Sequence, residues 1–132
     1  LINGIYPIGF GMHDAIQQTD GKAIDGYDVV GYFTNGKAEK GLEENEVEWA
    51  GAKWLFTSKE NKIAFEANPE KYAPQYGGHC SFAVSTGFAV ACDPETWLII
   101  EDKLYLLSAE DVKTEFQDNY KELIPACNDN WK

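Results

Sequence analysis

The pattern of apolar and polar positions divides the chain into short elements, among them two expected β-hairpins. Residues 47–56 read V-E-W-A-G-A-K-W-L-F, two short aromatic strands that meet at Ala50 and Gly51. Side chains alternate between the two faces of a strand, so this spacing and the glycine at the junction predict a hairpin. Two further apolar runs, 97–100 and 104–107, flank a polar Glu-Asp-Lys step and predict a second hairpin.

A helix is expected between these hairpins. Ser58 can cap its first turn, and Asn68 precedes Pro69, whose ring biases the residue before it away from helical geometry. The helix is therefore about nine residues long. Pro69 can open a further turn, because a helix needs no N–H at its first position. The apolar residues expected to face inward are Ile63, Ala64 and Ala67, with Phe65 beside them.

The C-terminal part of the chain also predicts a helix. Ser108 followed by Asp111 resembles a capping box, and an apolar residue then recurs at every fourth position. These recurring residues are Val112, Phe116 and Tyr120. Pro125 is expected to end the helix or to follow shortly after its end, with the tail to Trp131 packing as a further turn.

Residues 80–87 fit two periodicities. Cys80, Ala83, Val84 and Gly87 follow a helical spacing, with Gly87 as the C-terminal cap. A strand over 82–84 that returns through 88–90 is the rival interpretation, because alternation also fits. We prefer the short helix.

The first 22 residues predict an arm, and residues 23–132 predict the domain onto which it packs. The arm is rich in glycine and shows little periodicity, so no long helix is expected there. At the start of the domain, the β-branched and aromatic run in GYDVVGYF predicts a strand that ends at the turn Asn35-Gly36. The mixture of elements predicts a small single-domain α+β fold, with short antiparallel hairpins packed against several helices.

Composition narrows the function. The 132 residues are 44% hydrophobic, enough for a continuous core, and carry 22 acidic against 11 basic residues, a formal charge of −11. Such a charge repels nucleic acid phosphate and anionic lipid, so nucleic-acid binding is not expected. The longest apolar runs are of strand length, far from the roughly 20 residues of a membrane helix, so no membrane insertion is expected either.

Candidate chemistry concentrates in residues 72–81, which read YAPQYGGHCS. His79 and Cys80 are common metal ligands, and thiolate, imidazole and thioether together favour copper as Cu(I). His13 and Met12 could complete such a site if the arm brings them there. Tyr76, Gly77 and Gly78 are the candidate cofactor-binding or small-ligand residues, because glycine allows close approach of backbone or ligand. The alternative is a glycine-permitted turn that feeds a buried thiol.

The three cysteines leave several hypotheses open. A bridge between Cys92 and Cys127 would close a loop of about 35 residues and stabilise the fold by about 3 to 4 kcal/mol, with Cys80 left free, but two other pairings exist. Cys80 could instead be the nucleophile of a thiol-dependent enzyme. His79 would point away from it in regular structure, so His13 would have to act as the base. Haem with His79 or His13 as axial ligand is a further alternative.

Several separated motifs resemble the YHS domain family. In residues 51–74, GAKWLFTSKENKIAFEANPEKYAP, the family's positions are occupied by Phe56, Ser58, Phe65, Pro69 and Tyr72. GYDVVGYF, YGGHCSFAVSTG and DPETWLIIEDKLYL are similar to stretches of longer, stand-alone YHS-type proteins, so that the resemblance covers residues 23–131.

The resemblance implies a fold more directly than a ligand. YHS domains of copper-transporting ATPases are thought to bind metal through cysteines, but Gly31, Thr57 and Asn61 stand at those positions here. A hydroxyl and a carboxamide are poor ligands for soft metals, so that metal site is not expected. Stand-alone members resembling this chain often carry a secretion signal. This likeness and the absent start methionine predict a periplasmic or otherwise exported location.

The leading interpretation is a non-catalytic binding or accessory domain of the YHS type whose ligand is unassigned, with a soft metal such as copper as one candidate. Its aromatic residues are expected to form the core and one pocket. Those residues are Trp49, Trp54, Tyr76 and Trp97. The sequence names no protein partner.

Overall fold

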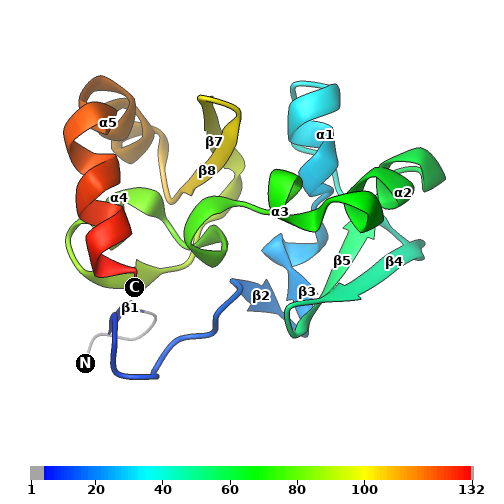
Figure 1. Cartoon of the computed structure of the whole chain (residues 1–132), viewed down its shortest axis with the longest axis horizontal. Coiled ribbons are helices and arrows are strands. Elements are labelled where there is room, and N and C mark those ends of the chain that lie inside the picture. The colour runs from blue at the N-terminus through cyan, green and yellow to red at the C-terminus, as the bar shows by residue number, and fades with distance from the viewer. Residues whose placement is uncertain (1–4, 132) are drawn as a thin grey trace.

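The computed structural model describes residues 5–131, and over them the protein has the expected α+β fold, with three small sheets (Figure 1). Two hydrophobic cores lie side by side. The first core is centred on Trp54, Phe56 and Phe65, and the second on Val84 and Phe116. No helix in this part of the chain is long and apolar enough to cross a membrane.

The predicted hairpin at 47–56 is confirmed. β4 (Leu42–Trp49) pairs antiparallel with β5 (Ala52–Phe56) through a turn in which Ala50 has φ 53° and Gly51 φ 78°. β4 starts earlier than the alternation predicts. Two short strands, β2 (Gln18–Thr19) and β3 (Lys22–Ala23), extend this sheet in the order β2-β3-β5-β4.

The predicted helix after this hairpin is also confirmed, but not its buried face. α2 (Lys59–Ala67) has nine residues, and the Ser58 hydroxyl accepts a hydrogen bond from the Asn61 N–H at 3.1 Å. Pro69 opens α3 (Pro69–Tyr72) as expected. The side chain that α2 buries is Phe65, whereas Ile63 is 56% exposed, because α2 covers only one edge of the aromatic first core.

The predicted strand in GYDVVGYF is wrong, because this segment forms α1 (Val29–Thr34). The Asp28 side chain accepts hydrogen bonds from the Val30 and Gly31 N–H groups and so caps the helix. This capping outweighs the strand preference of the two valines. Asn35 then ends α1 and Gly36 turns the chain at φ 67°, as the turn signal predicted.

The second predicted hairpin separates the two cores. It consists of β7 (Asp93–Ile100) and β8 (Lys103–Leu107) and stands between the two halves of the molecule in Figure 1. Its side chains alternate: Leu104 and Leu106 belong to the first core, Tyr105 and Leu107 to the second. Both faces of this two-stranded sheet are therefore buried.

The segment that carries YGGHCS crosses from one core to the other. A 3-10 turn, η2 (Gln75–Gly78), is followed by α4 (Ser81–Ser85), and Gly87 with φ 94° ends that helical turn. The preferred short helix is confirmed. The rival interpretation holds for its return strand alone, since β6 (Phe88–Val90) pairs with the arm's β1 (Ile5–Pro7).

The C-terminal helix α5 (Glu110–Asn130) is confirmed, but both of its predicted ends are wrong. Ala109 precedes the helix without a side-chain cap, because the Ser108 hydroxyl bonds the Cys80 thiol instead. Pro125 lies inside the helix. The helix bends at Asn119, where the backbone is non-helical, so Pro125 falls within a second helical stretch that continues to Asn130.

Candidate functional site

The N-terminal arm and the YGGHCS segment together line a pocket of about 250 Å³. The arm contributes Tyr6, Met12 and His13, and the segment contributes His79. Three of the four residues proposed as metal ligands thus lie around one cavity. Met12 is 43% exposed, so its thioether is accessible at the pocket mouth.

A single backbone carbonyl positions both imidazoles. The Asp14 oxygen lies 2.9 Å from Nδ1 of His13 and 2.8 Å from Nε2 of His79. The two ring centroids are 5.4 Å apart and the rings are nearly perpendicular. Each histidine uses one nitrogen on this carbonyl, and the other nitrogen of each ring has no hydrogen-bond partner within residues 5–131.

Burial keeps His79 neutral. Its side chain is only 6% exposed, and this burial lowers the pKa of the imidazole below its ordinary value of 6.5. The bond to the Asp14 carbonyl opposes burial and raises the pKa, and the charge of nearby His13 lowers it by a smaller amount. A neutral imidazole is the form that coordinates a metal ion.

The Trp131 ring packs against the rings of both histidines. Its ring centroid lies 5.1 Å from that of His13, 5.6 Å from that of His79 and 6.2 Å from that of Tyr76. The sequence pattern did not predict Trp131 as a site residue. Trp131 directly follows α5, and its position beside the histidines depends on where that helix ends in the fold. The end of α5 thus reaches the same aromatic cluster as the arm.

The glycine pair allows the arm to approach. The Ala15 carbonyl packs against the Cα of Gly77, where a Cβ would overlap it, and the Gln17 N–H donates to the Gly77 carbonyl at 2.7 Å. Gly78 packs against Ile24. The close approach for which glycine is required is thus one of backbone to backbone.

Tyr76 faces another part of the surface. Its hydroxyl donates to Oδ1 of Asn128 at 2.9 Å, and its ring lines a second hollow, beside Trp131. Of the three residues predicted to bind a cofactor, Tyr76 is therefore the one that lines a pocket.

Cys80 points away from the histidine pocket. It is 1% exposed, and its thiol donates to the Ser108 hydroxyl at 3.4 Å. His79 and Cys80 therefore diverge, as the backbone argument predicted. Neither the thiol-enzyme nor the haem alternative gains support from this arrangement.

The bridge between Cys92 and Cys127, one of three pairings that the sequence left open, is not formed. All three cysteines are free and buried. The Cys92 thiol donates to Oε1 of Gln17 in the first core, and the Cys127 thiol donates to the Ser81 carbonyl in the second. The loop-length argument could not show that the two thiols belong to different cores.

Burial makes two of these thiols unreactive, which gives a testable pH dependence. It raises the pKa of the Cys92 thiol, and that of Cys127 to about 11. Because the folded state holds the Cys127 proton longer than the unfolded state, the contribution of Cys127 to stability is complete below pH 9 and is lost as pH rises through about 11. We expect urea unfolding to show this decline, and Cys127→Ala to flatten it.

Iodoacetamide labelling checks the same burial directly. At pH 8 we expect the folded protein to take up label far more slowly than the urea-unfolded protein, because the thiolate is the reacting form. Rapid labelling of Cys92 or Cys127 in the folded state would contradict their burial. Cys80 is the comparison thiol, since its exposure of 1% lies between the 0% of Cys127 and the 9% of Cys92.

A buried carboxylate forms a second polar cluster, 0% exposed, at Asp28. Oδ1 accepts from the backbone of Val30 at 2.9 Å and Gly31 at 3.1 Å. Oδ2 accepts from the Thr57 N–H and hydroxyl, both at 2.9 Å, and from Nδ2 of Asn61 at 2.8 Å. This cluster joins the start of α1, the end of β5 and the first turn of α2.

The residues that donate hydrogen bonds to Asp28 lie in a part of the chain that a comparison with protein families identifies. Residues 30–76 match the model of the YHS domain. These residues form a YHS domain. No curated protein and no solved structure matches the chain.

The three positions at which the resemblance places metal-binding cysteines surround the carboxylate of Asp28, which lies just before the matched residues. Gly31, Thr57 and Asn61 converge on Asp28, so the three positions are neighbours in space, as a metal site would require. Each now donates a hydrogen bond. None of the three residues is a cysteine, so these positions supply hydrogen-bond donors to Asp28 and no thiolate.

The remaining described residues offer no alternative of the same kind. Within residues 5–131, no three side chains of histidine, cysteine, aspartate or glutamate are grouped so that they could hold a metal ion. Met12, His13 and His79 are the predicted ligands that the structure brings to one pocket.

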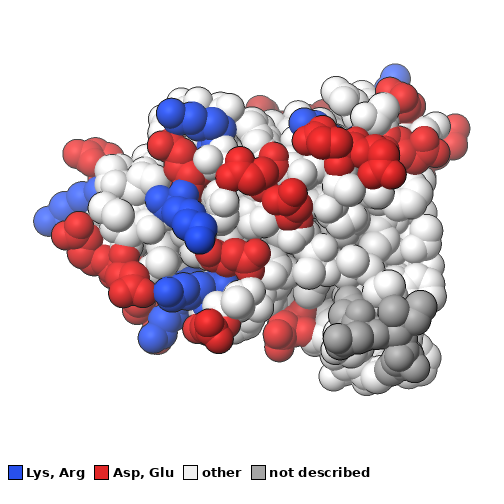
Figure 2. Space-filling model, turned by 180° about the vertical axis from the view of Figure 1, so that it is seen from behind, with Lys and Arg blue, Asp and Glu red and all other residues white. Residues whose placement is uncertain are grey.

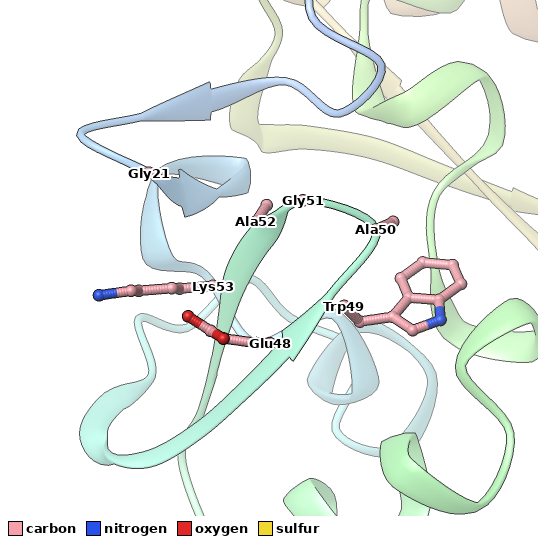
Figure 3. A pocket seen from close by; sticks show the side chains of 7 residues that line it. All are labelled: Gly21, Glu48, Trp49, Ala50, Gly51, Ala52 and Lys53. Atoms are coloured by element: carbon pink, nitrogen blue, oxygen red, sulfur yellow. The ribbon is translucent and has the colours of Figure 1, made fainter.

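A hollow of about 410 Å³ at the tip of the β4–β5 hairpin is lined by no histidine, cysteine or methionine (Figure 3). Its charged side chains are Glu48 and Lys53, which lie on adjacent strands, and its other lining residues are small except for Trp49. Trp49 projects away from the strands, toward the segment after α3 (Figure 3).

Proposed function

We propose that this protein is a non-catalytic binding module of the YHS type that takes copper, as Cu(I), at the pocket lined by Met12, His13 and His79. The observation that carries the proposal is the docking of the arm, which brings two imidazoles and a thioether to one cavity. The residues that line this pocket come from the arm and from residues 79–91, next to the segment 30–76 that matches the YHS model.

The donor set suits Cu(I). Thioether sulfur selects soft ions, imidazole is acceptable to copper, and three ligands satisfy Cu(I) without a carboxylate. The low exposure of His79 keeps its ring in the neutral, ligating form. Harder ions such as Mg²⁺ and Ca²⁺ are held mainly by carboxylates and other oxygen ligands, and Asp14 is the sole carboxylate residue that lines this pocket.

The proposal includes a periplasmic or otherwise exported location. It is supported by the likeness of residues 23–131 to stand-alone YHS-type proteins, many of which carry a secretion signal. Fractionation of cells that express the gene from its own start codon tests it, and recovery of the protein with cytoplasmic markers would contradict it.

Competition with a coloured Cu(I) chelator under reducing conditions tests copper binding. The loss of residues that merely orient metal ligands costs about 10- to 100-fold in affinity. We therefore expect His79→Ala, His13→Ala and Met12→Leu each to weaken Cu(I) binding by at least about tenfold.

The matched control is Cys80→Ser, next to His79 in sequence but outside the pocket. We expect this variant to bind Cu(I) like the unchanged protein. Equal affinity in all three pocket variants would overturn the proposed site, and a selective loss in Cys80→Ser would move the site to the thiol.

A further inference from the structure

The second hollow, about 380 Å³ in volume, lies where three distant segments meet. Trp49 comes from the end of β4, Tyr76 from η2 and Trp131 from the residue after α5. Glu70 of α3 also lines it. The hollow is separate from the histidine pocket, with which it shares none of its lining residues.

The aromatic walls of this hollow are held by contacts inside the protein. The Trp49 ring packs edge-on against Trp54 and Phe65, at centroid distances of 5.6 and 5.7 Å. On the other side, the hydroxyl of Tyr76 is fixed by Asn128, and its ring contacts Trp131. A ligand would therefore meet rings that are already oriented, so little ordering cost accompanies binding.

The hollow is electrostatically negative. Glu70 is the sole charged residue among those that line it, and no lysine or arginine does so. Glu70 forms no ion pair with any residue in the range 5–131, and the ammonium of adjacent Lys71 lies over the Tyr72 ring, 5.2 Å from its centroid. The chain's charge of −11, visible as the excess of acidic side chains in Figure 2, adds a long-range attraction for cations.

We propose that this hollow binds a small organic cation, a quaternary ammonium or a protonated alkylamine. The faces of tryptophan and tyrosine attract such cations through the ring quadrupole, and a carboxylate nearby adds a direct charge interaction. A neutral ligand such as a sugar would gain from stacking and from the amides of Gln75 and Asn128, but not from the unpaired charge of Glu70.

Choline and its neutral isostere 3,3-dimethylbutan-1-ol form the decisive pair of probes, because they match in shape and differ in charge. We expect ligand-observed NMR and calorimetry on the metal-free protein to detect choline binding and at least about tenfold weaker binding of the isostere. Equal binding of the two probes, binding of glucose in place of choline, or binding of none of them would overturn the proposal.

Two variants place the bound cation. Glu70→Gln, on an exposed helix, and Trp49→Leu are each expected to weaken choline binding by at least about threefold. Glu66→Gln, an exposed carboxylate on α2 outside the hollow, is the matched control and should bind choline like the unchanged protein. Unchanged affinity in correctly folded Glu70→Gln and Trp49→Leu would exclude this hollow. His79→Ala should retain choline binding, and its loss there would place the cation at the histidine pocket instead.

Discussion

Asp28→Asn is expected to lower the free energy of unfolding by about 3 to 5 kcal/mol, the largest stability effect of any single substitution proposed for this chain. The carboxylate is fully buried and accepts five hydrogen bonds, without an ion-pair partner among residues 5–131. Small domains are stable by about 5 to 15 kcal/mol, so a loss of this size leaves the variant marginal.

The asparagine side chain has nearly the same shape but the wrong chemistry. Whichever way the amide turns, its NH₂ group replaces an oxygen that accepts hydrogen bonds, from α1 on one side and from Thr57 and Asn61 on the other. Donors then face donors around a side chain that is 0% exposed. A buried polar group left without a partner costs about 1 to 3 kcal/mol, and this substitution orphans at least two.

Urea unfolding followed by circular dichroism measures the effect. Asp118→Asn, the same change at an exposed position on α5, is the matched control and should shift stability by less than about 0.5 kcal/mol. Thr57→Val removes one side-chain donor and keeps the carboxylate, so we expect the free energy of unfolding to fall by about 1 kcal/mol. Equal stability of Asp28→Asn and Asp118→Asn would show that Asp28 does not hold the three elements together.

The same carboxylate shows where sequence reasoning succeeds and where it fails. Both hairpins and α2 follow from local signals, alternation with a turn and a serine cap before a proline, and the structure confirms them. The segment GYDVVGYF carries two competing signals. Its valines favour a strand, whereas Asp28 in front of them favours a helix start, and tertiary contacts to Thr57 and Asn61 decide for the helix.

Long-range pairing limits the remaining predictions. Nothing local shows that Cys92 and Cys127 belong to different cores, or that the Ser108 hydroxyl bonds Cys80 and not a helix N-terminus. Pro125 is a reliable signal against an undisturbed helix. The bend at Asn119, which lets α5 continue past it, has no clear signature in the sequence.

The candidate site was predictable by residue type but not by geometry. The sequence predicts Met12, His13 and His79 as metal ligands because their side chains coordinate metals. The structure places all three around one cavity. Met12 and His13 lie beside His79 because the N-terminal arm packs against the segment that carries His79. Cys80 was selected for the same reason, yet it points into the second core, because the backbone turns between it and His79.

Gly77→Ala is expected to release the arm from the domain. Gly77 has φ +64°, a conformation that side chains rarely adopt, and an alanine Cβ would overlap the Ala15 carbonyl. We expect residues 14–17 to move away and so remove the overlap between the alanine Cβ and the Ala15 carbonyl. This movement breaks the hydrogen bond from the Gln17 N–H to the Gly77 carbonyl. We expect a loss of about 1 to 3 kcal/mol in unfolding free energy.

Gly36→Ala is the control that separates the overlap with the Ala15 carbonyl from the cost of a positive φ in an alanine. Gly36 has φ +67°, almost the same as Gly77, but no heavy atom lies within 4 Å of a Cβ built there. Both variants therefore pay a similar conformational cost, about 1 to 2 kcal/mol, and only Gly77→Ala should detach the arm. Hydrogen exchange over β2 and the residues before it distinguishes them: we expect faster exchange in Gly77→Ala and unchanged exchange in Gly36→Ala.

Copper affinity then connects the arm to the proposed site. Met12 and His13 reach His79 only because the arm is docked, so Gly77→Ala should weaken Cu(I) binding by at least about tenfold while all three ligands remain in the chain. Gly36→Ala should bind Cu(I) like the unchanged protein. Faster exchange in Gly77→Ala with unchanged copper affinity would confirm the docking and place the copper ligands elsewhere, because a site that survives release of the arm cannot depend on Met12 and His13. Unchanged exchange in Gly77→Ala would contradict the role of Gly77 itself, since the arm would then tolerate a Cβ where the Ala15 carbonyl lies.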